Sequence, residues 1–576
     1  MSYGTGLRQF LTALVVLLSS LRAWPAGGPN IVLITLDSIR ADSVGVLAKN
    51  ARLTPNLDLL AHESVIFGRA YAQAPEAIAS TATILTGTYP QTHGANQFGV
   101  ALPSSVPYLP ELLHAAGYRT AAFVGTILLD PRNGPFQGYD RGFERYEADF
   151  HLPERGESRF QTVERSPQQV ADALTKWLPR HQTAPFFLWA SIHLKPALSR
   201  TGYEQSARSA DAALGRILDA LHAHNLYDGS LILLVSSHSE SLGAHGEATH
   251  GTFVYDETVH VPLLLKLPKK ALSGERLSRV RLVDIAPTVL EVAGIPVPSE
   301  MQGQSLMRAA NSNAQVDQPA YTRGELAQAD FGCSVLESWR VGKYLYIRAP
   351  QPELYDLSAD PSAEHNLAQN SKATLDTMAS QLQSFDARLA KQSTSTNPSG
   401  LTSSEIQKLA SLGYVGLQKT NAGIGAASEG TNPKDLVGAI NKTLRAYAEL
   451  EDGKPEVAMP ILRDVLISHP KAYFVQYAMG EALMQQGHEA EAIPHLHKAV
   501  ELQPNSPWAH LRIGLALSET GDFKTAAVHL EIASTRLPHS SMVHAKLAQV
   551  YEKLGREEDA HRQLSLASET AVTKAH

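Results

Sequence analysis

The sequence predicts a layered α/β domain with a small antiparallel sheet at its C-terminal end, followed by an all-α helical-repeat domain. Two continuous apolar runs, residues 30–37 and 231–238, indicate strands buried on both faces, as in parallel sheets. A 34-residue period in the last quarter of the chain indicates helical repeats. Because ligands bind beyond the carboxyl ends of parallel strands, we expect Asp37 and His238 to line one crevice.

The composition is that of a folded protein with several domains. The chain has 576 residues, more than one ordinary core accommodates, which predicts roughly two to four domains. Hydrophobic residues make up 43% of the chain and charged residues 19%, as in folded proteins. The formal net charge of −7 and the lack of a dense Lys/Arg stripe argue against nucleic-acid binding.

The N-terminal segment has the pattern of a signal peptide. Arg8 precedes an apolar stretch, residues 10–21, that is too short to span a bilayer. We therefore expect residues 1–26 to direct export, either to the periplasm or to the medium. Residues 22–28 lack a clean A-x-A cleavage signal, so an uncleaved N-terminal anchor is the alternative. Cys333 is the single cysteine, which excludes an intramolecular disulfide, and we interpret it as a packing residue.

Residues 28–390 are expected to form the α/β domain, because apolar strand-like runs alternate there with amphipathic helix-like runs. The strand-like runs are 119–124, 185–191 and 260–266, and the helix-like runs are 209–224 and 284–293. Residues 320–367 have the pattern of short antiparallel strands, of which 341–347 is the clearest. Residues 391–432, rich in Ser, Thr, Asn and Gly, are expected to be a linker.

Residues 433–572 are expected to form four helix–turn–helix repeats. Small or helix-ending residues recur every 34 positions: Gly453, Gly487, Gly521 and Gly555; Ala458, Ala492, Ala526 and Ala560; Gly480, Gly514 and Ala548; Pro470, Pro504 and Pro538. This period resembles that of the tetratricopeptide repeat (TPR), in which small residues let paired helices approach closely. Because such arrays present a concave surface, the expected partner of this region is a protein or peptide.

Several motifs in residues 30–370 together resemble the sulfatase branch of the alkaline phosphatase superfamily. They follow the order of that family and comprise residues 34–42, 54–58, 84–94, the loop 238–250, 283–288 and 352–357. Residues 409–416 resemble the junction in sulfatase-like proteins that are fused to helical repeats. The resemblance implies the layered fold of the superfamily and, for active members, hydrolysis of sulfuric or phosphoric esters.

The catalytic positions implied by the resemblance are degenerate in this chain. Active members use a nucleophile, usually a cysteine converted to formylglycine, together with a divalent cation that carboxylates from two strand ends hold. The family's nucleophile motif, C-x-P-S-R, lies shortly before a Thr-Gly pair, and counting back from Thr86-Gly87 places Ala77 at its nucleophile and Thr81 at its arginine. Ser237 stands where the family has a metal-binding aspartate. The methyl group of Ala77 can neither attack an ester nor bind a metal ion, so we expect a catalytically inactive site.

Asp37 and His238 would then be remnants of the metal site, and one carboxylate is a poor calcium site. By the resemblance, His250 occupies the position of a catalytic lysine, His193 lies at or near a sulfate-contacting position, and His245 keeps its place in the loop. Each of these three is equally interpretable as a scaffold histidine that bonds to backbone. Arg40 and His93 are interpreted as structural.

Two rebuilt sites are alternatives to a silenced one. Asp37, His238, His245 and His250 are residue types that zinc accepts, so a repurposed zinc site is the first. A displaced nucleophile at Ser80, Thr81 or Thr83 is the second, and its hydroxyl would need an adjacent base or metal. We therefore expect no cofactor, with calcium or zinc as the alternative.

The leading functional hypothesis is an exported, sulfatase-like pseudoenzyme. It would bind an anionic ligand, such as a sulfated or phosphorylated sugar, and a protein partner through its TPR-like array. An active ester hydrolase with a rebuilt metal site is the first alternative, and a structural scaffold that mounts the repeats is the second. No transmembrane span is expected beyond the signal segment.

Overall fold

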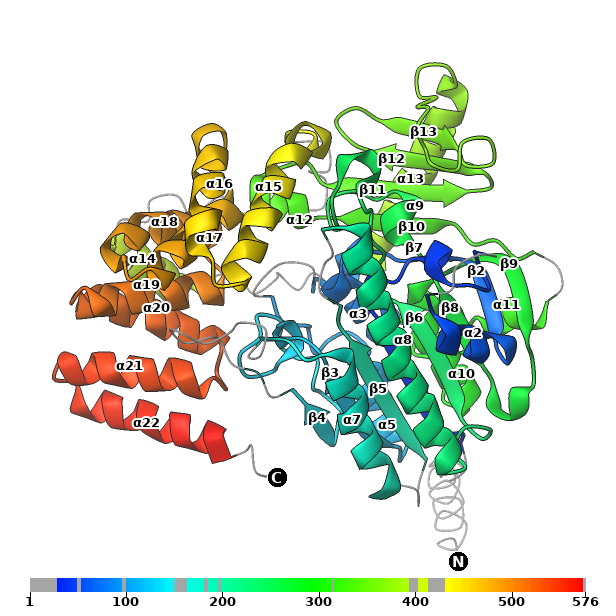
Figure 1. Ribbon diagram of the computed structural model, residues 1–576, viewed down its shortest axis with the longest axis horizontal. Coiled ribbons are helices and arrows are strands. Elements are labelled where there is room, and N and C mark those ends of the chain that lie inside the picture. Colours follow the sequence, from blue (N-terminus) through cyan, green and yellow to red (C-terminus); the bar gives the residue numbers. More distant parts are fainter. Residues whose placement is uncertain are drawn as a thin grey trace, which may run out of the picture.

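A computed structural model of the chain describes residues 28–48, 53–95, 100–148, 150, 163–180, 185–194, 198–312, 315–392, 402–412 and 430–572. The expected signal segment and much of the expected linker lie outside these residues. Figure 1 shows an α/β part and, beside it, a stack of helices that runs to the C-terminus. Among the described residues, no helix combines the length and apolar character that crossing a membrane requires.

A mixed sheet of nine strands forms the core of the α/β part. The strand order is β4-β3-β5-β1-β6-β8-β2-β7, with β9 paired to β2. The strands are β1 (Ile31–Leu36), β2 (Val65–Tyr71), β3 (Arg119–Val124), β4 (Arg145–Glu147), β5 (Phe186–Ile192), β6 (Leu231–Ser236), β7 (His260–Val261), β8 (Leu263–Lys266) and β9 (Gly274–Arg281). β1 is parallel to both β5 and β6, and Leu36 pairs with Ile192 and Ser236. The residues that follow these three strands therefore meet at one edge of the sheet.

Helices cover both faces of this sheet (Figure 1). Apolar side chains of α2 (Pro55–His62), α7 (Pro167–Trp177) and α8 (Arg200–Ala223) pack on one face. Those of α3 (Ala77–Thr86), α5 (Leu109–Ala115) and α10 (Ile285–Ala293) pack on the other. Shorter helices are α4 (Pro90–His93), α9 (Asp256–Val259) and α11 (Met307–Asn311). This is the layered α/β fold that the alternating pattern predicts.

A second sheet of four antiparallel strands follows. It comprises β10 (Ala320–Gly324), β11 (Leu336–Val341), β12 (Tyr344–Arg348) and β13 (Glu353–Asp356), with α12 (Leu326–Phe331) in a connection and α13 (Lys372–Gln392) packed against the strands. Cys333 is buried beside Ala327 and Ile440, and burial raises the pKa of its thiol to about 12. An un-ionised, buried thiol agrees with its interpretation as a packing residue.

Three predicted boundaries differ from the structure. The helix expected at 209–224 begins at Arg200, because the Ser199 side chain caps it by accepting from the Gly202 N–H. The strand expected at 260–266 is split between β7 and β8 at Pro262, which has no N–H to donate. The strand expected at 341–347 is two strands, since Gly342 at φ 58° turns the chain between β11 and β12.

Eight helices form the C-terminal array in residues 433–572, as the 34-residue period predicts. They are α15 (Pro433–Glu451), α16 (Pro455–Ser468), α17 (Tyr473–Gln485), α18 (Glu489–Leu502), α19 (Pro507–Glu519), α20 (Phe523–Arg536), α21 (Ser541–Lys553) and α22 (Glu557–Val572). The four periodic glycines, from Gly453 to Gly555, have φ between 71° and 88° and connect the helices of each pair. This left-handed conformation favours glycine. A further helix, α14 (Ser403–Ser411), contacts α20.

The periodic position of Gly480 sets how closely two helices approach. A Cβ atom there would lie 2.5 Å from the Cγ and Cδ2 atoms of Leu496 on the paired helix α18. We expect Gly480→Val to lower the free energy of unfolding by about 1–3 kcal/mol, because overpacking forces the helices apart. Urea denaturation followed by circular dichroism measures this change.

Gly438 in α15 is the matched control, because a Cβ there meets nothing within 4 Å. Gly438→Ala is expected to leave stability unchanged or to raise it by up to about 1 kcal/mol, since alanine favours the helix. Equal destabilisation by both substitutions would contradict the close-approach argument.

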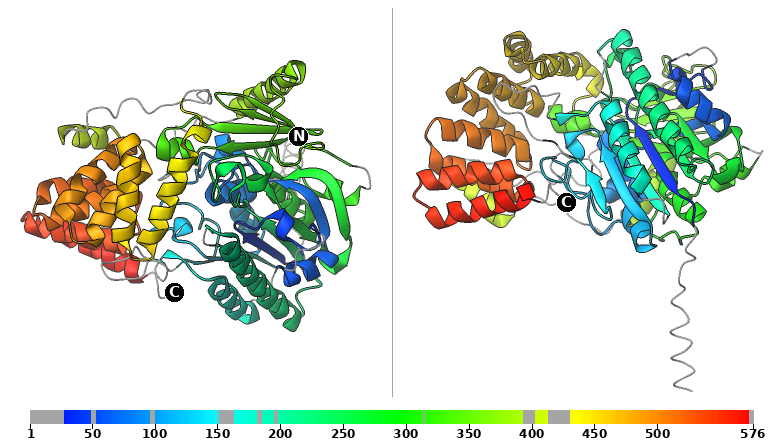
Figure 2. Two further views of the ribbon diagram at one scale, coloured as in Figure 1. Left: turned by 45° about the horizontal axis from the view of Figure 1, so that its top comes forward. Right: turned by 60° about the horizontal axis from the view of Figure 1, so that its bottom comes forward.

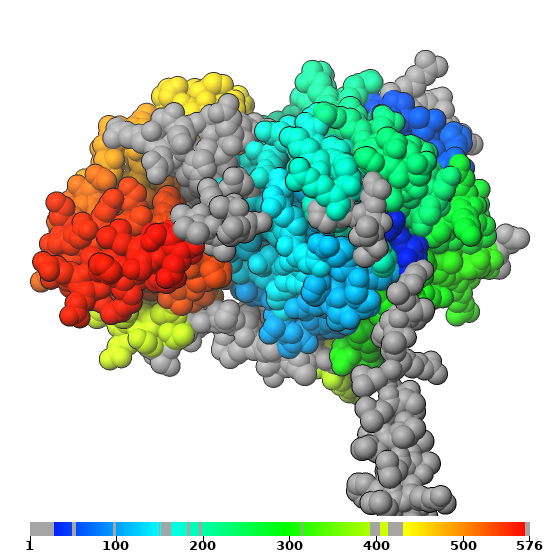
Figure 3. All heavy atoms as spheres, turned by 90° about the horizontal axis from the view of Figure 1, so that it is seen from below, coloured from blue at the N-terminus to red at the C-terminus, as the bar shows by residue number. Residues whose placement is uncertain are grey.

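The array is docked on the α/β part rather than joined to it by a linker alone. Figures 2 and 3 show the array, in yellow to red, against one flank of the α/β part. Asn441 of α15 donates to Gly246 O (2.7 Å) and accepts from the Ala248 N–H (3.0 Å). Trp508 and Ser540 of the array both donate to Asn133, to its backbone and side-chain oxygens respectively.

Candidate functional site

Asp37 lies at the carboxyl edge of the central strands, immediately after β1, and is 2% exposed. Its Oδ1 accepts a hydrogen bond from Ser237 Oγ at 2.6 Å, and its Oδ2 lies 2.9 Å from His193 Nδ1. Ser237 and His193 follow β6 and β5, the two neighbours of β1. The sheet order therefore brings three of the expected site residues into direct contact, and both oxygens of Asp37 are engaged.

His193 supplies the positive charge next to Asp37. Its Nε2 lies 3.5 Å from Glu164 Oε1, so the ring stands between two carboxylates. Burial alone would lower the pKa of His193, but its bonds to Asp37 and Glu164 raise that pKa to about 10. The imidazolium form therefore persists at neutral pH. His193 also lines a cleft of about 710 Å³ together with Glu164 and Arg165.

His238 is buried behind Asp37 at 1% exposure. Its Nδ1 lies 3.0 Å from Ser237 Oγ, and its Nε2 lies 3.1 Å from Ser38 Oγ. Burial, reinforced by the nearby His250 and His193, lowers the pKa of His238 well below its usual value. The ring is therefore neutral at physiological pH. Ser38 has φ 65°, which is unusual for a residue other than glycine and turns this segment sharply after β1.

Ala77 begins α3, so a methyl group occupies the position of the implied nucleophile. Thr81, at the implied arginine position, is 2% exposed. Ser80 Oγ donates to the Ala74 carbonyl at 2.9 Å, and Thr83 Oγ1 lies 3.1 Å from His93 Nε2. These two hydroxyls are engaged in holding the helix, which argues against a displaced nucleophile at either position.

Arg40 and His93 have structural environments. Arg40 is paired with Asp42 and donates to the Glu240 carbonyl oxygen at 2.5 Å, and His93 is fully buried and accepts from the Ala95 N–H through Nδ1. Burial lowers the pKa of His93 to about 3, so its ring is neutral. Both residues hold loops in place, as interpreted from the sequence.

His250 lies beside His238, with ring centroids 4.1 Å apart, and its Nδ1 is 2.9 Å from Glu240 Oε1. His245 lies apart from this group. Its ring stacks on Tyr255 at 3.7 Å, and its Nε2 is 3.7 Å from Glu257. Sequence reasoning assigned no role to Glu240 or to Glu164. Glu240 could have been found from its place in the same polar loop, whereas Glu164 carries no motif.

The calcium site implied by the resemblance does not fit these residues. Calcium takes about six to eight oxygen ligands, several of them carboxylates. Of the two carboxylate positions that the resemblance implies, 37 and 237, only Asp37 is acidic, and Ser237 and His193 already hydrogen-bond to its two oxygens. Ser237 therefore stands at the position of a metal-binding carboxylate. The positive charge beside Asp37 comes from the His193 imidazolium.

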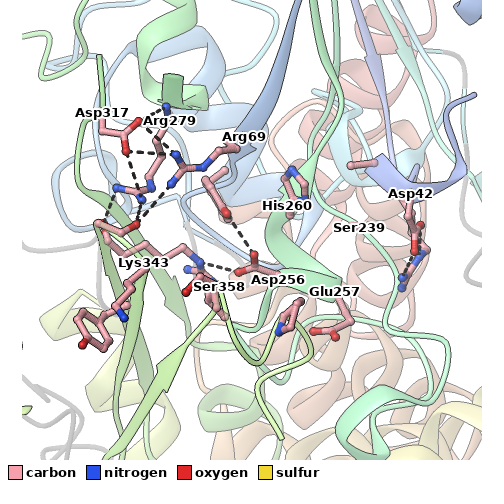
Figure 4. A pocket seen from close by; sticks show the side chains of 18 of the residues that line it. Asp42, Arg69, Ser239, Asp256, Glu257, His260, Arg279, Asp317, Lys343 and Ser358 are labelled. Atoms are coloured by element: carbon pink, nitrogen blue, oxygen red, sulfur yellow. Dashed lines mark hydrogen bonds and ion pairs between the residues drawn. The ribbon is translucent and has the colours of Figure 1, made fainter. Parts of the chain in front are cut away.

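A polar cavity of about 750 Å³ lies nearby, between the loop after β6 and the second sheet (Figure 4). Arg69 and Arg279 pair with Asp317 on one side, and Asp42 lies on the other. The buried Nε of Arg279 has no hydrogen-bond partner among the described residues. The cavity is therefore lined by several cations, and carboxylates that pair with them lie in the same lining.

Comparisons with known proteins agree with this architecture. The family model described as Sulfatase matches residues 29–194, and the model of the N-sulphoglucosamine sulphohydrolase C-terminal region matches residues 243–392. The chain belongs to the sulfatase family. A TPR repeat model matches residues 480–521 of the array. The family and the fold class predicted from the sequence are thereby confirmed.

Named relatives of this sulfatase-family chain cover different parts of it. An ulvan-active sulfatase of Formosa agariphila is 26% identical over 495 residues, which are 75% of this chain and 89% of the relative. N-acetylgalactosamine-6-sulfatase of Homo sapiens is 26% identical over 52% of this chain and 69% of its own length. Arylsulfatase K of Rattus norvegicus is 33% identical, but over only 29% of this chain and 32% of its own length.

Solved structures support the fold. A phosphonate monoester hydrolase of Agrobacterium radiobacter superposes with a TM-score of 0.51 at 22% identity, over 62% of this chain and 96% of that protein. A phosphonate monoester hydrolase from Silicibacter pomeroyi gives a TM-score of 0.52 at 18% identity, over 65% of this chain and 97% of its own. At these identities the likeness establishes the shared α/β architecture of the family.

Proposed function

We propose that this sulfatase-family protein binds an anionic ligand and a protein partner without hydrolysing esters. The arrangement at the strand ends is the observation that carries the proposal. Ala77 supplies no attacking atom, and both oxygens of Asp37 are engaged by Ser237 and His193. Ester hydrolysis of the family's kind needs a nucleophile and a cation-binding carboxylate at these positions.

The cavity of about 750 Å³ is the proposed ligand site. Arg69 and Lys343 line it with partly exposed side chains, and these two cations are proposed to contact the anionic oxygens of the ligand. A guanidinium group can donate two parallel hydrogen bonds to two oxygens of a sulfate or phosphate ester. Two relatives carry names that refer to sulfated carbohydrates, ulvan and N-acetylgalactosamine 6-sulfate, so a sulfated sugar is the proposed ligand class.

The array is proposed to recruit a protein, since TPR-type helix pairs present an extended surface for peptides. Residues 1–26 are proposed to act as an export signal, because their short apolar stretch follows a basic residue. Mass spectrometry of the N-terminus of the mature protein distinguishes a cleaved signal from an uncleaved anchor. Export also agrees with a polysaccharide-type ligand.

Calorimetric titration of the purified protein tests the ligand proposal. N-acetylgalactosamine 6-sulfate is expected to bind at least about tenfold more tightly than unsulfated N-acetylgalactosamine, because hydrogen bonds to charged groups contribute about 1.5–3 kcal/mol. Arg69→Gln is expected to remove this preference. Arg145→Gln, at an exposed arginine on β4 outside the cavity, is the control and should leave the preference unchanged.

A hydrolysis assay tests the other half of the proposal. The wild-type protein and an Asp37→Asn variant are expected to give the same background rate with an aryl sulfate and an aryl phosphate. Turnover by the wild type above that variant would establish an active hydrolase and would contradict the binding role.

A further inference from the structure

The loop after β6 brings together three side chains of metal-binding types, two of them buried, in a combination that the family resemblance does not imply. One ligand atom from each of His238, Glu240 and His250 lies within 4.8 Å of the other two. His238 and Glu240 are each 1% exposed, and the His250 side chain is 17% exposed. Two imidazoles and a carboxylate are thus gathered at one point beyond the carboxyl edge of the sheet.

Glu240 has an unused oxygen within this group. Its Oε1 lies 2.9 Å from His250 Nδ1, whereas its Oε2 is buried and has no hydrogen-bond partner among the described residues. A buried carboxylate oxygen without a hydrogen-bond partner is energetically unfavourable. A cation bound between Glu240 and the two histidines would remove that cost.

The hydrogen-bond chain from Asp37 sets His238 in the tautomer that a metal requires. A carboxylate only accepts, so Ser237 Oγ donates its proton to Asp37 and accepts from the Nδ1–H of His238. The Nε2 of His238 therefore carries a lone pair, which accepts from Ser38 Oγ at 3.1 Å, and a metal ion would take the place of this hydrogen bond. A carboxylate that fixes the orientation and tautomer of a histidine from behind is typical of metal sites.

We propose that His238, Glu240 and His250 bind a zinc ion. Two imidazole nitrogens and one carboxylate oxygen match the ligand preference of zinc, while calcium requires oxygen ligands throughout. In a tetrahedral site the ligand atoms lie about 3.3 Å apart, so side-chain movements of about an ångström would close the site. The ion would displace the proton shared by His250 and Glu240. Asp37 acts here as a positioning residue.

The proposed ion would also fix the surface on which the array docks. Residues 246–248 belong to the same loop and make both hydrogen bonds to Asn441 of α15. Ligands from both ends of the loop, at 238–240 and at 250, would hold these residues in place. Zinc is therefore expected to raise the thermal stability of the full chain.

Zinc titration of the untagged full chain, stripped of metal beforehand and measured against a chromophoric chelator, tests the site. We expect one zinc per chain, with an excess of calcium unable to compete. Glu240→Gln and His250→Ala are each expected to weaken zinc binding by about 100-fold or more, and Ser237→Ala by about 10- to 100-fold. The zinc-induced rise in melting temperature should disappear in Glu240→Gln.

His245→Ala is the matched control, because His245 lies in the same loop but stacks on Tyr255 away from the group. It is expected to leave zinc affinity unchanged. The proposal is overturned if zinc binds the Glu240→Gln and His250→Ala variants as tightly as the wild type, or if the wild type takes up no zinc or prefers calcium. Circular dichroism of each metal-free variant separates lost binding from lost folding.

Discussion

Replacing Glu337 with glutamine is expected to lower the free energy of unfolding by about 3 kcal/mol at neutral pH. Glu337 is 1% exposed in the second sheet, and it accepts hydrogen bonds from Arg323 Nη1 (2.7 Å), Arg348 Nε (2.7 Å) and Tyr321 Oη (2.6 Å). Glutamine preserves the shape but removes the charge that two guanidinium groups face. The buried positive charges would then be undercompensated.

The sign of the pH dependence follows from the same contacts. Burial alone would raise the pKa of Glu337, but Arg323 and Arg348 lower it below its usual value. The stabilisation from Glu337 is therefore complete above the ordinary glutamate pKa of about 4.3 and is lost as the pH falls below it. Urea denaturation at pH 7 and at pH 3.5 should give a larger difference between wild type and Glu337→Gln at pH 7.

Asp386→Asn is the matched control for Glu337→Gln. Asp386 pairs with the same Arg348 at 2.5 Å, but its side chain is 20% exposed and lies at the edge of the network. We expect this variant to lose about 1 kcal/mol or less. An equal decrease in the free energy of unfolding in both variants would contradict the argument that the burial of Glu337 makes its ion pairs important for stability.

Acid is expected to destabilise the array through one pair of histidines. His510 and His529 are fully buried, with Nδ1 atoms 3.0 Å apart, and His510 Nε2 lies 2.9 Å from the Pro504 carbonyl oxygen. Since a carbonyl only accepts, His510 Nε2 carries the proton and its Nδ1 accepts from the Nδ1–H of His529. The His510 ring must therefore be neutral, because a second proton on its Nδ1 would face the Nδ1–H of His529, while burial disfavours a second proton on His529.

Burial lowers the pKa of His510 to about 4 and that of His529 well below its usual value. The unfolded chain takes up these protons near pH 6.5. The stabilisation is therefore present above pH 6.5 and is lost as the pH falls toward 4. From His510 alone the loss between pH 7 and pH 4 is on the order of 3 kcal/mol.

The neighbouring repeats supply the variant that tests this effect. At the equivalent positions, Gln476 pairs with His495 at 2.8 Å and His544 pairs with Gln563 at 2.6 Å, so His529→Gln copies a pair that the chain already uses. This variant is expected to remove most of the acid sensitivity, because a glutamine oxygen accepts from a protonated His510. Tryptophan fluorescence during urea denaturation at pH 7 and pH 4 measures the change.

His561→Gln serves as the comparison, since His561 is exposed on α22. It should retain the acid sensitivity of the wild type. Unchanged acid sensitivity in His529→Gln would contradict the paired-histidine explanation.

The sequence by itself determined the elements and the repeat array. The apolar runs at 31–36 and 231–236 became the central strands β1 and β6, and the glycines recurring from Gly453 to Gly555 became the turns of the helix pairs. These features are encoded locally, in burial periodicity and in backbone conformations that favour glycine. The prediction that Ala77 stands at the nucleophile position also needed no tertiary contact, because it rests on the family resemblance and on counting within one helix.

Only the tertiary structure decided which side chains meet. The sheet order places β5, β1 and β6 side by side, so residues more than 150 positions apart occupy the two oxygens of Asp37. The tertiary structure also pairs Glu164 with His193 and Glu240 with His250, and it brings Asn441 of the array to residues 246–248. The physical reason is that the spacing of residues along a strand fixes which face a side chain occupies, whereas its partner depends on which strand lies next to it.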